Sequence, residues 1–219
     1  MNWHFLTFFG DSTLLLPSAA IVFIILILSP ASRKPTWQWV LLFGGVGAVV
    51  CISKLAFMGW GIGSREFDFT GFSGHSALSA SIWPVMLWLL TGKCSPVIRR
   101  LAIAVGYLLA LAVGYSRLMI HVHSTSEVIT GLTLGFIVSS TFLLLQRGAE
   151  PPRLSYRKIA VAVAVPLLLI NTGKAAPTQG LLEQIAVTIS PASKPFTRAD
   201  LHAKPPSSPK PLNITKNTD

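Results

Sequence analysis

Residues 101–127 read LAIAVGYLLALAVGYSRLMIHVHSTSE, an uncharged apolar run followed by a cluster of polar and ionisable side chains. Crossing the hydrocarbon core of a bilayer takes about 20 mostly apolar residues, with about 17 as a practical minimum. The stretch 101–116 carries no charge and meets that length once a few polar flanking residues are included. It therefore predicts a transmembrane helix with the polar cluster just beyond its end.

The rest of the chain repeats this pattern. Of its 219 residues, 51% are hydrophobic and only 12% are charged, whereas a soluble domain carries about 25% charge. Further uncharged runs cover residues 14–28, 36–53, 76–92 and 128–146. The predicted fold class is an all-α polytopic membrane protein, a bundle of six transmembrane helices. We expect these helices near residues 13–29, 36–60, 74–92, 101–117, 124–146 and 157–173.

The net charge of +10 is unevenly distributed along the chain. Basic residues follow the first, third and fifth predicted spans, which is the positive-inside pattern of cytoplasmic loops. They are Arg33, Lys34, Lys93, Arg99, Arg100, Arg147, Arg153, Arg157 and Lys158. This distribution argues against nucleic-acid binding and predicts that the N-terminus and the loops after spans two and four lie outside. The expected location is the cell membrane, in a bacterium the inner membrane.

The composition divides the chain into a transmembrane domain, residues 1–173, and a basic tail, residues 174–219. The tail is rich in Pro, Lys, Ser and Thr, which is typical of disorder. Most of its basic residues lie far from the last span, so we expect the tail outside, on the same face as the polar cluster. Four apolar residues in it have helical spacing and are candidates for a short surface helix, with a transient helix without function as the simpler interpretation: Leu181, Leu182, Ile185 and Ile189.

The polar cluster contains a histidine and a carboxylate at helical spacing. His123 and Glu127 are an i,i+4 pair, which places both on one face of a helix. A carboxylate bonded to one imidazole nitrogen fixes the tautomer and leaves the other nitrogen free to attack. The structural alternative is a capping box between Ser124 and Glu127, and we expect one role to exclude the other.

A second polar segment precedes the third predicted helix. The loop 61–73 is rich in glycine and polar residues, and non-helical backbone of this kind is tolerated near a membrane where it lines a wet cavity. Ser73, Gly74 and His75 stand where the loop becomes helical. The first turn of a helix offers free N–H groups and a positive dipole, which suit an anion. A helix start that is merely capped is the alternative.

Three cations lie near these segments. Lys54 interrupts the end of the second span, where a charge is costly and is therefore a functional candidate; the alternative is a lysine that reaches the outer interface. Arg117 ends the fourth span, where an arginine can also serve as a membrane anchor. Arg65, in the loop after span two, can be solvated, can pair with Asp68, or can reach the site.

At these residues the chain resembles the type 2 phosphatidic acid phosphatase superfamily of membrane phosphohydrolases. The family has three motifs: a Lys followed after six residues by Arg-Pro, then Pro-Ser-Gly-His, then Ser-Arg-x5-His-x3-Asp. The third motif is matched by Ser116, Arg117 and His123, with Glu127 in the place of the Asp.

The other two motifs are matched less fully. Ser73, Gly74 and His75 match the second, with Phe72 in the place of its Pro. In the first, Lys54 fits by position, but Gly61 stands where the Arg would be, and Arg65 is a candidate for a displaced substitute.

The resemblance implies a role for each matched residue. His123 would be the nucleophile that becomes phosphohistidine, oriented by Glu127, and His75 would protonate the leaving oxygen and later activate water. The remaining matched groups would bind the phosphate oxygens: Lys54, Arg117, Ser73, the Gly74 N–H and the displaced candidate Arg65. The chain has only eight acidic residues, and a two-metal site needs several converging carboxylates. We therefore expect no metal and no cofactor.

The prediction is a membrane phosphohydrolase with its site on the outer, periplasmic face, cleaving a lipid phosphate or pyrophosphate. An isoprenyl pyrophosphate, a phosphatidic acid-like lipid and a lipid A phosphate are all open as substrates, and the oligomeric state is open too. One alternative is a phosphotransferase that passes the phosphoryl group to another lipid. The other is a non-catalytic lipid-binding or transport protein with a degenerate site.

Overall fold

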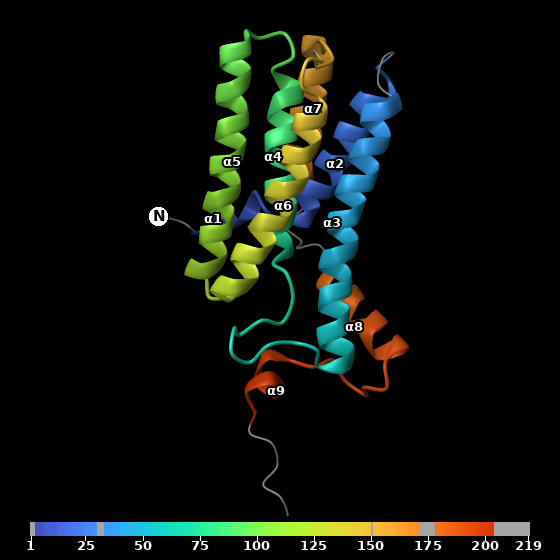
Figure 1. Ribbon diagram of the computed structural model, residues 1–219, viewed down its shortest axis with the longest axis vertical. Coiled ribbons are helices and arrows are strands. Elements are labelled where there is room, and N and C mark those ends of the chain that lie inside the picture. Colours follow the sequence, from blue (N-terminus) through green and yellow to red (C-terminus); the bar gives the residue numbers. More distant parts are fainter. Residues whose placement is uncertain (1–2, 30–32, 150, 171–177, 204–219) are drawn as a thin grey trace, which may run out of the picture.

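The computed structural model describes residues 3–29, 33–149, 151–170 and 178–203. Within these ranges the chain is helical with short connections, and the regular β-structure is limited to one isolated bridge between Ser64 and Phe69. The helices are α1 (Trp3–Phe8), α2 (Ser12–Ile27), α3 (Arg33–Trp60), α4 (Gly74–Leu90), α5 (Pro96–Met119), α6 (Thr125–Leu145), α7 (Tyr156–Ile170), α8 (Thr178–Ile189) and α9 (Arg198–His202). Figure 1 shows α2 to α7 side by side in an elongated bundle.

The six predicted segments correspond to α2 to α7. The fourth begins earlier than expected, at Pro96 instead of residue 101, because Ser95 caps the helix by accepting a hydrogen bond from the Ile98 N–H. Proline suits the first helical position, so the helix continues through Arg99 and Arg100. Residues 171–173 of the sixth segment lie outside the described part of the chain.

Helix α4 lies at the centre of the bundle, in contact with α2, α3, α5 and α6. It approaches α6 most closely at Gly131 and Gly135. A Cβ at Gly131 would lie 2.8 Å from the Ser73 carbonyl oxygen, and one at Gly135 would lie 2.3 Å from that of Ala77. Small residues that let helix backbones approach are typical of packing within membranes. The same contact fixes the start of α4 against α6.

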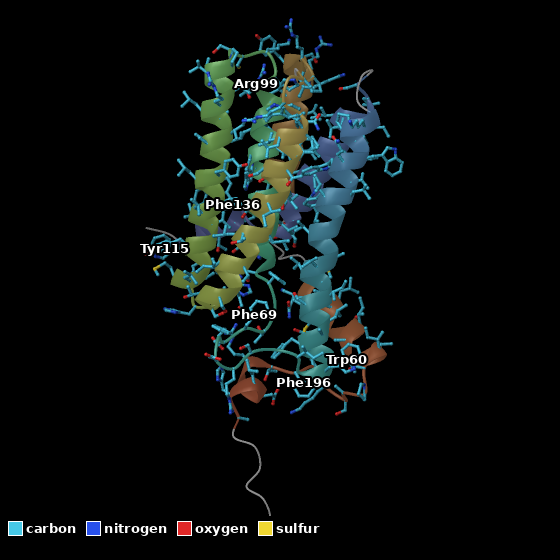
Figure 2. All side chains as sticks on the ribbon, in the orientation of Figure 1. Trp60, Phe69, Arg99, Tyr115, Phe136 and Phe196 are labelled. Carbon is cyan, nitrogen blue, oxygen red and sulfur yellow. The ribbon has the colours of Figure 1, made fainter. Side chains whose placement is uncertain are left out.

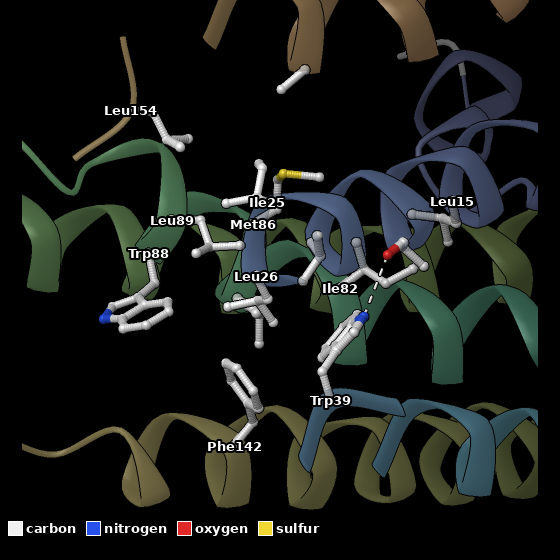
Figure 3. Close-up of a cluster of buried hydrophobic side chains, with 14 residues drawn as sticks. Leu15, Ile25, Leu26, Trp39, Ile82, Met86, Trp88, Leu89, Phe142 and Leu154 are labelled. Atoms are coloured by element: carbon white, nitrogen blue, oxygen red, sulfur yellow. Dashed lines mark hydrogen bonds between the residues drawn. The ribbon is translucent and has the colours of Figure 1, made fainter. Parts of the chain in front are cut away.

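A hydrophobic core joins α2, α3, α4, α6 and α7 (Figure 3). Trp39 and Phe142 are among its largest fully buried side chains, with ring centroids 5.6 Å apart in an edge-to-face arrangement. The indole N–H of Trp39 donates to the Ala19 carbonyl, so this large ring is buried without an unpaired donor.

The outer faces of the bundle are apolar as well. On α5 the exposed large side chains recur every three or four residues: Leu101, Val105, Leu108, Leu111 and Tyr115. In the described residues, four segments are long and apolar enough to cross a membrane: Trp3–Ile27, Lys34–Trp60, Pro96–Met119 and Thr125–Leu145. Helix α4, at 17 residues, and α7, at 15, are shorter. The chain is therefore an all-α membrane protein.

The two ends of the bundle differ in chemistry. One end carries the turns between α4 and α5 and between α6 and α7, with the basic residues of those turns; Figure 2 shows Arg99 there. At that end the Lys93 ammonium lies 4.8 Å from the centroid of the Tyr156 ring. The other end, which we call the site end, carries loop 61–73, the turn between α5 and α6, and α8 and α9.

The C-terminal segment differs from the sequence-based expectation. Residues 178–203 form α8, a linker and α9, although disorder was expected apart from the candidate surface helix at 181–189, which α8 contains. Residues 204–219 lie outside the described part. Of the predicted apolar stripe on α8, Leu182 packs with Ala186 on Phe57 and Met58 of α3. Leu181 and Ile189 remain more than half exposed. The segment lies at the site end, together with the turn between α5 and α6; that this end lies outside stays a prediction.

Candidate active site

The turn between α5 and α6 sets the position of His123. The N–H of Val122 donates to the Arg117 carbonyl and that of His121 to the Leu118 carbonyl, which is the Schellman arrangement at a helix C-terminus. His121 has φ 56°, the left-handed conformation that this motif requires. The chain then reverses, and His123 follows immediately before the first turn of α6.

Glu127 both orients His123 and caps α6, so the expectation that one role excludes the other was wrong. Its Oε2 lies 2.7 Å from His123 Nδ1 and accepts the Ser124 N–H at 3.2 Å. The Ser124 hydroxyl in turn accepts the Glu127 N–H. One carboxylate oxygen serves both purposes because the two donors lie at adjacent positions of the same helix start.

The contact with Glu127 fixes the tautomer of His123. An ionised carboxylate can only accept hydrogen bonds, so Nδ1 carries the proton and Nε2 keeps its lone pair. The His123 side chain is 15% exposed and that of Glu127 is 0% exposed. Burial lowers the pKa of His123 below its ordinary value of 6.5, although the hydrogen bond to Glu127 acts in the opposite direction. A neutral imidazole with a free Nε2 is a nucleophile.

The second oxygen of Glu127 is held by groups far away in the sequence. Its Oε1 accepts from both the N–H and the hydroxyl of Thr70, in the loop before α4. Arg198 of α9 donates to both carboxylate oxygens, at 2.8 and 2.7 Å. Neither Thr70 nor Arg198 was among the predicted site residues, since nothing local in the sequence marks a contact across such separations.

The start of α4 provides the helix N-terminus expected at Ser73. Its first helical hydrogen bond runs from the Ala77 N–H to the Ser73 carbonyl, so the N–H groups of Gly74, His75 and Ser76 have no partner within the helix. The Ser73 N–H itself donates to the Glu127 carbonyl. A Cβ at Gly74 would make only an ordinary contact of 3.6 Å with Val50. The packing of the protein therefore does not require glycine there, which leaves access to the backbone as its use.

His75 has a carboxylate partner that sequence analysis missed. Its Nε2 lies 3.7 Å from Asp11 Oδ2. Asp11 is the N-cap of α2, where its other oxygen accepts the N–H and hydroxyl of Thr13. Ser-Thr-Leu after Asp11 is a recognisable helix start, so the capping role was readable from sequence, but the approach to His75 was not.

Arg117 lies close enough to both His75 and His123 for its charge to act on each. One guanidinium nitrogen donates to the Thr7 hydroxyl at 3.3 Å, and Thr7 also bonds the Ser116 hydroxyl. Its Nε is buried and has no hydrogen-bond partner among the described residues. A buried unpaired donor is costly, and an anionic ligand would satisfy it.

Lys54 reaches the same region from α3. Its charge acts on His123, and the charges of Glu127 and Arg117 act on it in return. Its ammonium donates to the Gln179 side-chain oxygen of α8 at 3.2 Å. Gly71, in the loop above it, has φ 136°, and a Cβ there would lie 3.2 Å from the Lys54 side chain. The glycine thus lets the loop cross closely over Lys54.

Arg65 is the predicted residue that the structure does not bring to the site. It is exposed, and it donates from Nε and from a terminal nitrogen to the Leu201 and Ala203 carbonyls. Asp68, considered as its partner, instead binds Arg198 and His202. Arg65 therefore anchors α9 to the loop and is not the displaced substitute for the missing arginine.

Phe72 stands where the second family motif has a proline, and its contacts explain how the loop is held without one. The Phe72 N–H donates to the Ser53 hydroxyl at 3.2 Å, a hydrogen bond that a proline could not make. The Phe72 ring packs edge-to-face on Phe69, with centroids 5.5 Å apart. These contacts fix the loop before α4 without the proline of the motif.

These groups form one constellation at the site end. It has a buried histidine–carboxylate pair, a second histidine with its own carboxylate, two cations and a helix N-terminus. Among the described residues, no group of three or more His, Cys, Asp or Glu is placed to hold a metal ion.

The sequence model of one protein family, the PAP2 superfamily, matches residues 60–150 of this chain, which include the start of α4 and the turn between α5 and α6. The chain belongs to the PAP2 superfamily. Members of this superfamily are phosphatases and related hydrolases, and the match covers two of the three motifs. Lys54, Asp11 and Arg198 lie outside it.

A curated relative extends the similarity over nearly the whole chain. An "Uncharacterized 22.5 kDa protein in cps region" of Klebsiella pneumoniae is 58% identical over 205 residues, which cover 92% of this chain and 98% of that protein. The similarity therefore includes parts beyond the PAP2 match. No solved structure matches the chain.

Proposed function

We propose that this PAP2 protein is an integral membrane phosphohydrolase that removes a phosphate from a lipid phosphate or pyrophosphate through a phosphohistidine. The observation that supports it most is the 2.7 Å contact between His123 and the fully buried Glu127, beside a second histidine and two cations. Phosphoryl transfer depends chiefly on positioning and on stabilising charge, and this constellation offers both.

In the first step, Nε2 of His123 attacks phosphorus and the bond from phosphorus to the leaving oxygen breaks. His75 gives a proton to that oxygen, so the dephosphorylated lipid leaves as a neutral alcohol, or as a monophosphate when the substrate is a pyrophosphate. Glu127 accepts the Nδ1–H bond throughout and stabilises the positive charge that develops on the ring.

In the second step, His75 takes a proton from water, and the water oxygen attacks phosphorus. The bond between phosphorus and Nε2 breaks, inorganic phosphate leaves, and His123 returns to its neutral form. Arg117, Lys54, the Ser73 hydroxyl and the Gly74 N–H would hold the phosphate oxygens in both steps, because cations and helix N-termini stabilise the charge on the transferring group.

The proposed location is the cell membrane, in a bacterium the inner membrane, with the site on the outer face. The basic residues of the turns lie at the opposite end of the bundle, which the positive-inside rule assigns to the cytoplasm. A lipid phosphate in the outer leaflet would then present its headgroup to the site end.

Purified protein in detergent, incubated with EDTA and a panel of lipid phosphates, tests the proposal. The panel contains an isoprenyl pyrophosphate, a phosphatidic acid and a lipid A phosphate, and the readout is inorganic phosphate. We expect release from at least one of them, with none from the His123→Ala protein. Failure with every lipid would contradict the proposal, and transfer to a second lipid without free phosphate would indicate a phosphotransferase.

A further inference from the structure

Arg198 is the arginine that contacts Glu127 among the described parts of the chain, and it lies outside the PAP2 match. One terminal nitrogen of its guanidinium donates to both oxygens of Glu127. The other donates to the carbonyl of Asp68 at 3.0 Å and to its carboxylate. A planar guanidinium that spans two carboxylates in this way has a defined orientation.

Glu127 needs a cation because its side chain is 0% exposed. An isolated buried carboxylate is strongly destabilising unless it is paired and hydrogen-bonded. Thr70, Ser124 and His123 supply hydrogen bonds, but the first two are neutral, and burial favours the neutral form of His123 as well. Arg198 therefore supplies the charge that these donors lack.

The position of Arg198 is fixed by contacts that do not involve Glu127. The Phe196 N–H donates to the Met58 carbonyl at 2.8 Å, which ties the linker to the end of α3. Asp200 accepts the N–H and hydroxyl of Thr197 and so caps α9. Together with the Arg65 bonds to α9, these contacts hold the segment in place before any substrate binds. Figure 1 shows the segment at the site end.

We propose that Arg198 is a positioning residue of the active site: it compensates the charge of Glu127 and holds its carboxylate on Nδ1 of His123, so that Nε2 points to the phosphoryl group. The C-terminal segment 178–203, which the sequence presents as a tail, is thereby part of the site. This inference rests on the proposed function of His123 as the nucleophile.

Charges other than that of Arg198 also act on His123 and Glu127, and a titration test has to take them into account. Lys54, Arg117 and His75 act on His123 from α3, α5 and α4, and Lys54 interacts with Glu127. Asp68 faces Arg198 from the loop and is itself bonded by His202. Lys54, Arg117 and His75 remain when Arg198 alone is changed, so a shift in the titration of the pair reports on Arg198 and the Asp68 carboxylate that it binds. The pair is treated as one coupled unit.

The test is the full-length protein with Arg198→Gln, and its first readout is the NMR titration of the His123 imidazole, assigned with His123→Ala. Without the guanidinium, the uncompensated charge of Glu127 favours proton uptake, so the titration midpoint of His123 rises. Arg198→Lys, which keeps the charge but not the fork, should restore most of the midpoint. Lys194→Gln, an exposed cation in the same linker, should leave it unchanged.

Phosphate release provides the second readout. We expect Arg198→Gln to lower kcat by about 10- to 100-fold with little change in KM, because the nucleophile loses alignment, and to move the acid limb of the rate profile to higher pH. In a Glu127→Gln background, Arg198→Gln should add little. Asp200→Ala weakens the α9 cap but leaves the contact between Arg198 and Glu127 chemically intact. It therefore separates the effect of docking the C-terminal segment from the effect of aligning Glu127 and His123.

An unchanged His123 midpoint in the Arg198→Gln protein would overturn the proposal. An equal loss of kcat in Asp200→Ala and Arg198→Gln, with the same pH profile in both, would also overturn it and assign Arg198 to anchoring alone. The NMR readout needs no turnover, so it remains decisive if no lipid phosphate is hydrolysed, a result that would contradict the proposed function instead.

Discussion

The two histidine–carboxylate pairs of the site are built differently. His123 and Glu127 lie 2.7 Å apart, and the carboxylate is fully buried under donors from the start of α6, the loop before α4 and α9. His75 and Asp11 lie 3.7 Å apart, with side chains that are 25% and 20% exposed. The first pair is held rigidly, and the second has a longer contact and access to solvent.

The difference matches the two tasks proposed for the histidines. A nucleophile attacks along one direction, so its ring gains from a short, fixed bond to a carboxylate. An acid and base must give a proton to one oxygen and take it from another. The longer contact between His75 and Asp11 leaves the His75 proton free to move. On this account the tight pair belongs to covalent catalysis and the loose pair to proton transfer.

The largest effect is expected at His123. His123→Ala should abolish phosphate release, by about 10⁴-fold or more, because no other group can form the covalent intermediate. The matched control is His121→Asn, since asparagine tolerates the left-handed conformation that His121 adopts. It should keep most of the activity in the same phosphate-release assay. Reversed outcomes would show that the nucleophile is His121.

Next in size is the loss of the buried carboxylate charge. Glu127→Gln should lower kcat by about 10³-fold, since the wrong tautomer becomes accessible and the imidazolium loses its partner. Glutamine still fits the third position of a capping box, so the start of α6 should stay folded by circular dichroism. A variant with nearly normal kcat would show that the buried pair is structural only.

A smaller effect is expected at the second histidine. His75→Ala should slow phosphate release by about 10²-fold, within the usual range for general acid–base catalysis. A substrate with a very good leaving group, such as an aryl phosphate, needs no proton, and should restore the first step but not the hydrolysis of the phosphoenzyme. Rescue of both steps by that substrate would remove His75 from the second step.

The smallest change in rate is expected at Asp11. A partly exposed ion pair contributes less than about 1 kcal/mol, so Asp11→Asn should reduce kcat by less than about tenfold. Asparagine remains a good N-cap, so α2 should be unaffected. A loss as large as that of Glu127→Gln would mean that the two pairs work alike.

The pH profile distinguishes the two pairs by the titration of His123. Burial lowers the pKa of His123 below 6.5, so the neutral nucleophile persists at pH 6.5 and activity falls only as the pH drops through that lower value. The hydrogen bond to Glu127 raises this pKa, so Glu127→Gln should move the acid limb of kcat/KM to still lower pH. An acid limb that moves to higher pH in Glu127→Gln would show that this limb reports the titration of a group other than His123.

Much of the fold and part of the site follow from the sequence, for physical reasons. Uncharged runs predict spans because charge is costly in the bilayer, and the i,i+4 spacing predicts the contact between His123 and Glu127. Contacts between distant segments leave no such pattern: Thr70 and Arg198 lie 57 and 71 positions from Glu127. The composition of residues 178–203 also predicts disorder, because composition does not register the backbone and ion-pair contacts that dock this segment.

The most direct test of the account is to trap and locate the phosphoryl group. The His75→Ala protein is mixed with an aryl phosphate in the presence of EDTA, quenched under alkaline conditions that preserve phosphohistidine, and mapped by mass spectrometry. We predict an acid-labile phosphoryl group on His123, absent from the His75→Ala, His123→Ala double variant. A phosphoryl group on any other residue, or substrate consumption with no trapped intermediate, would contradict covalent catalysis by His123.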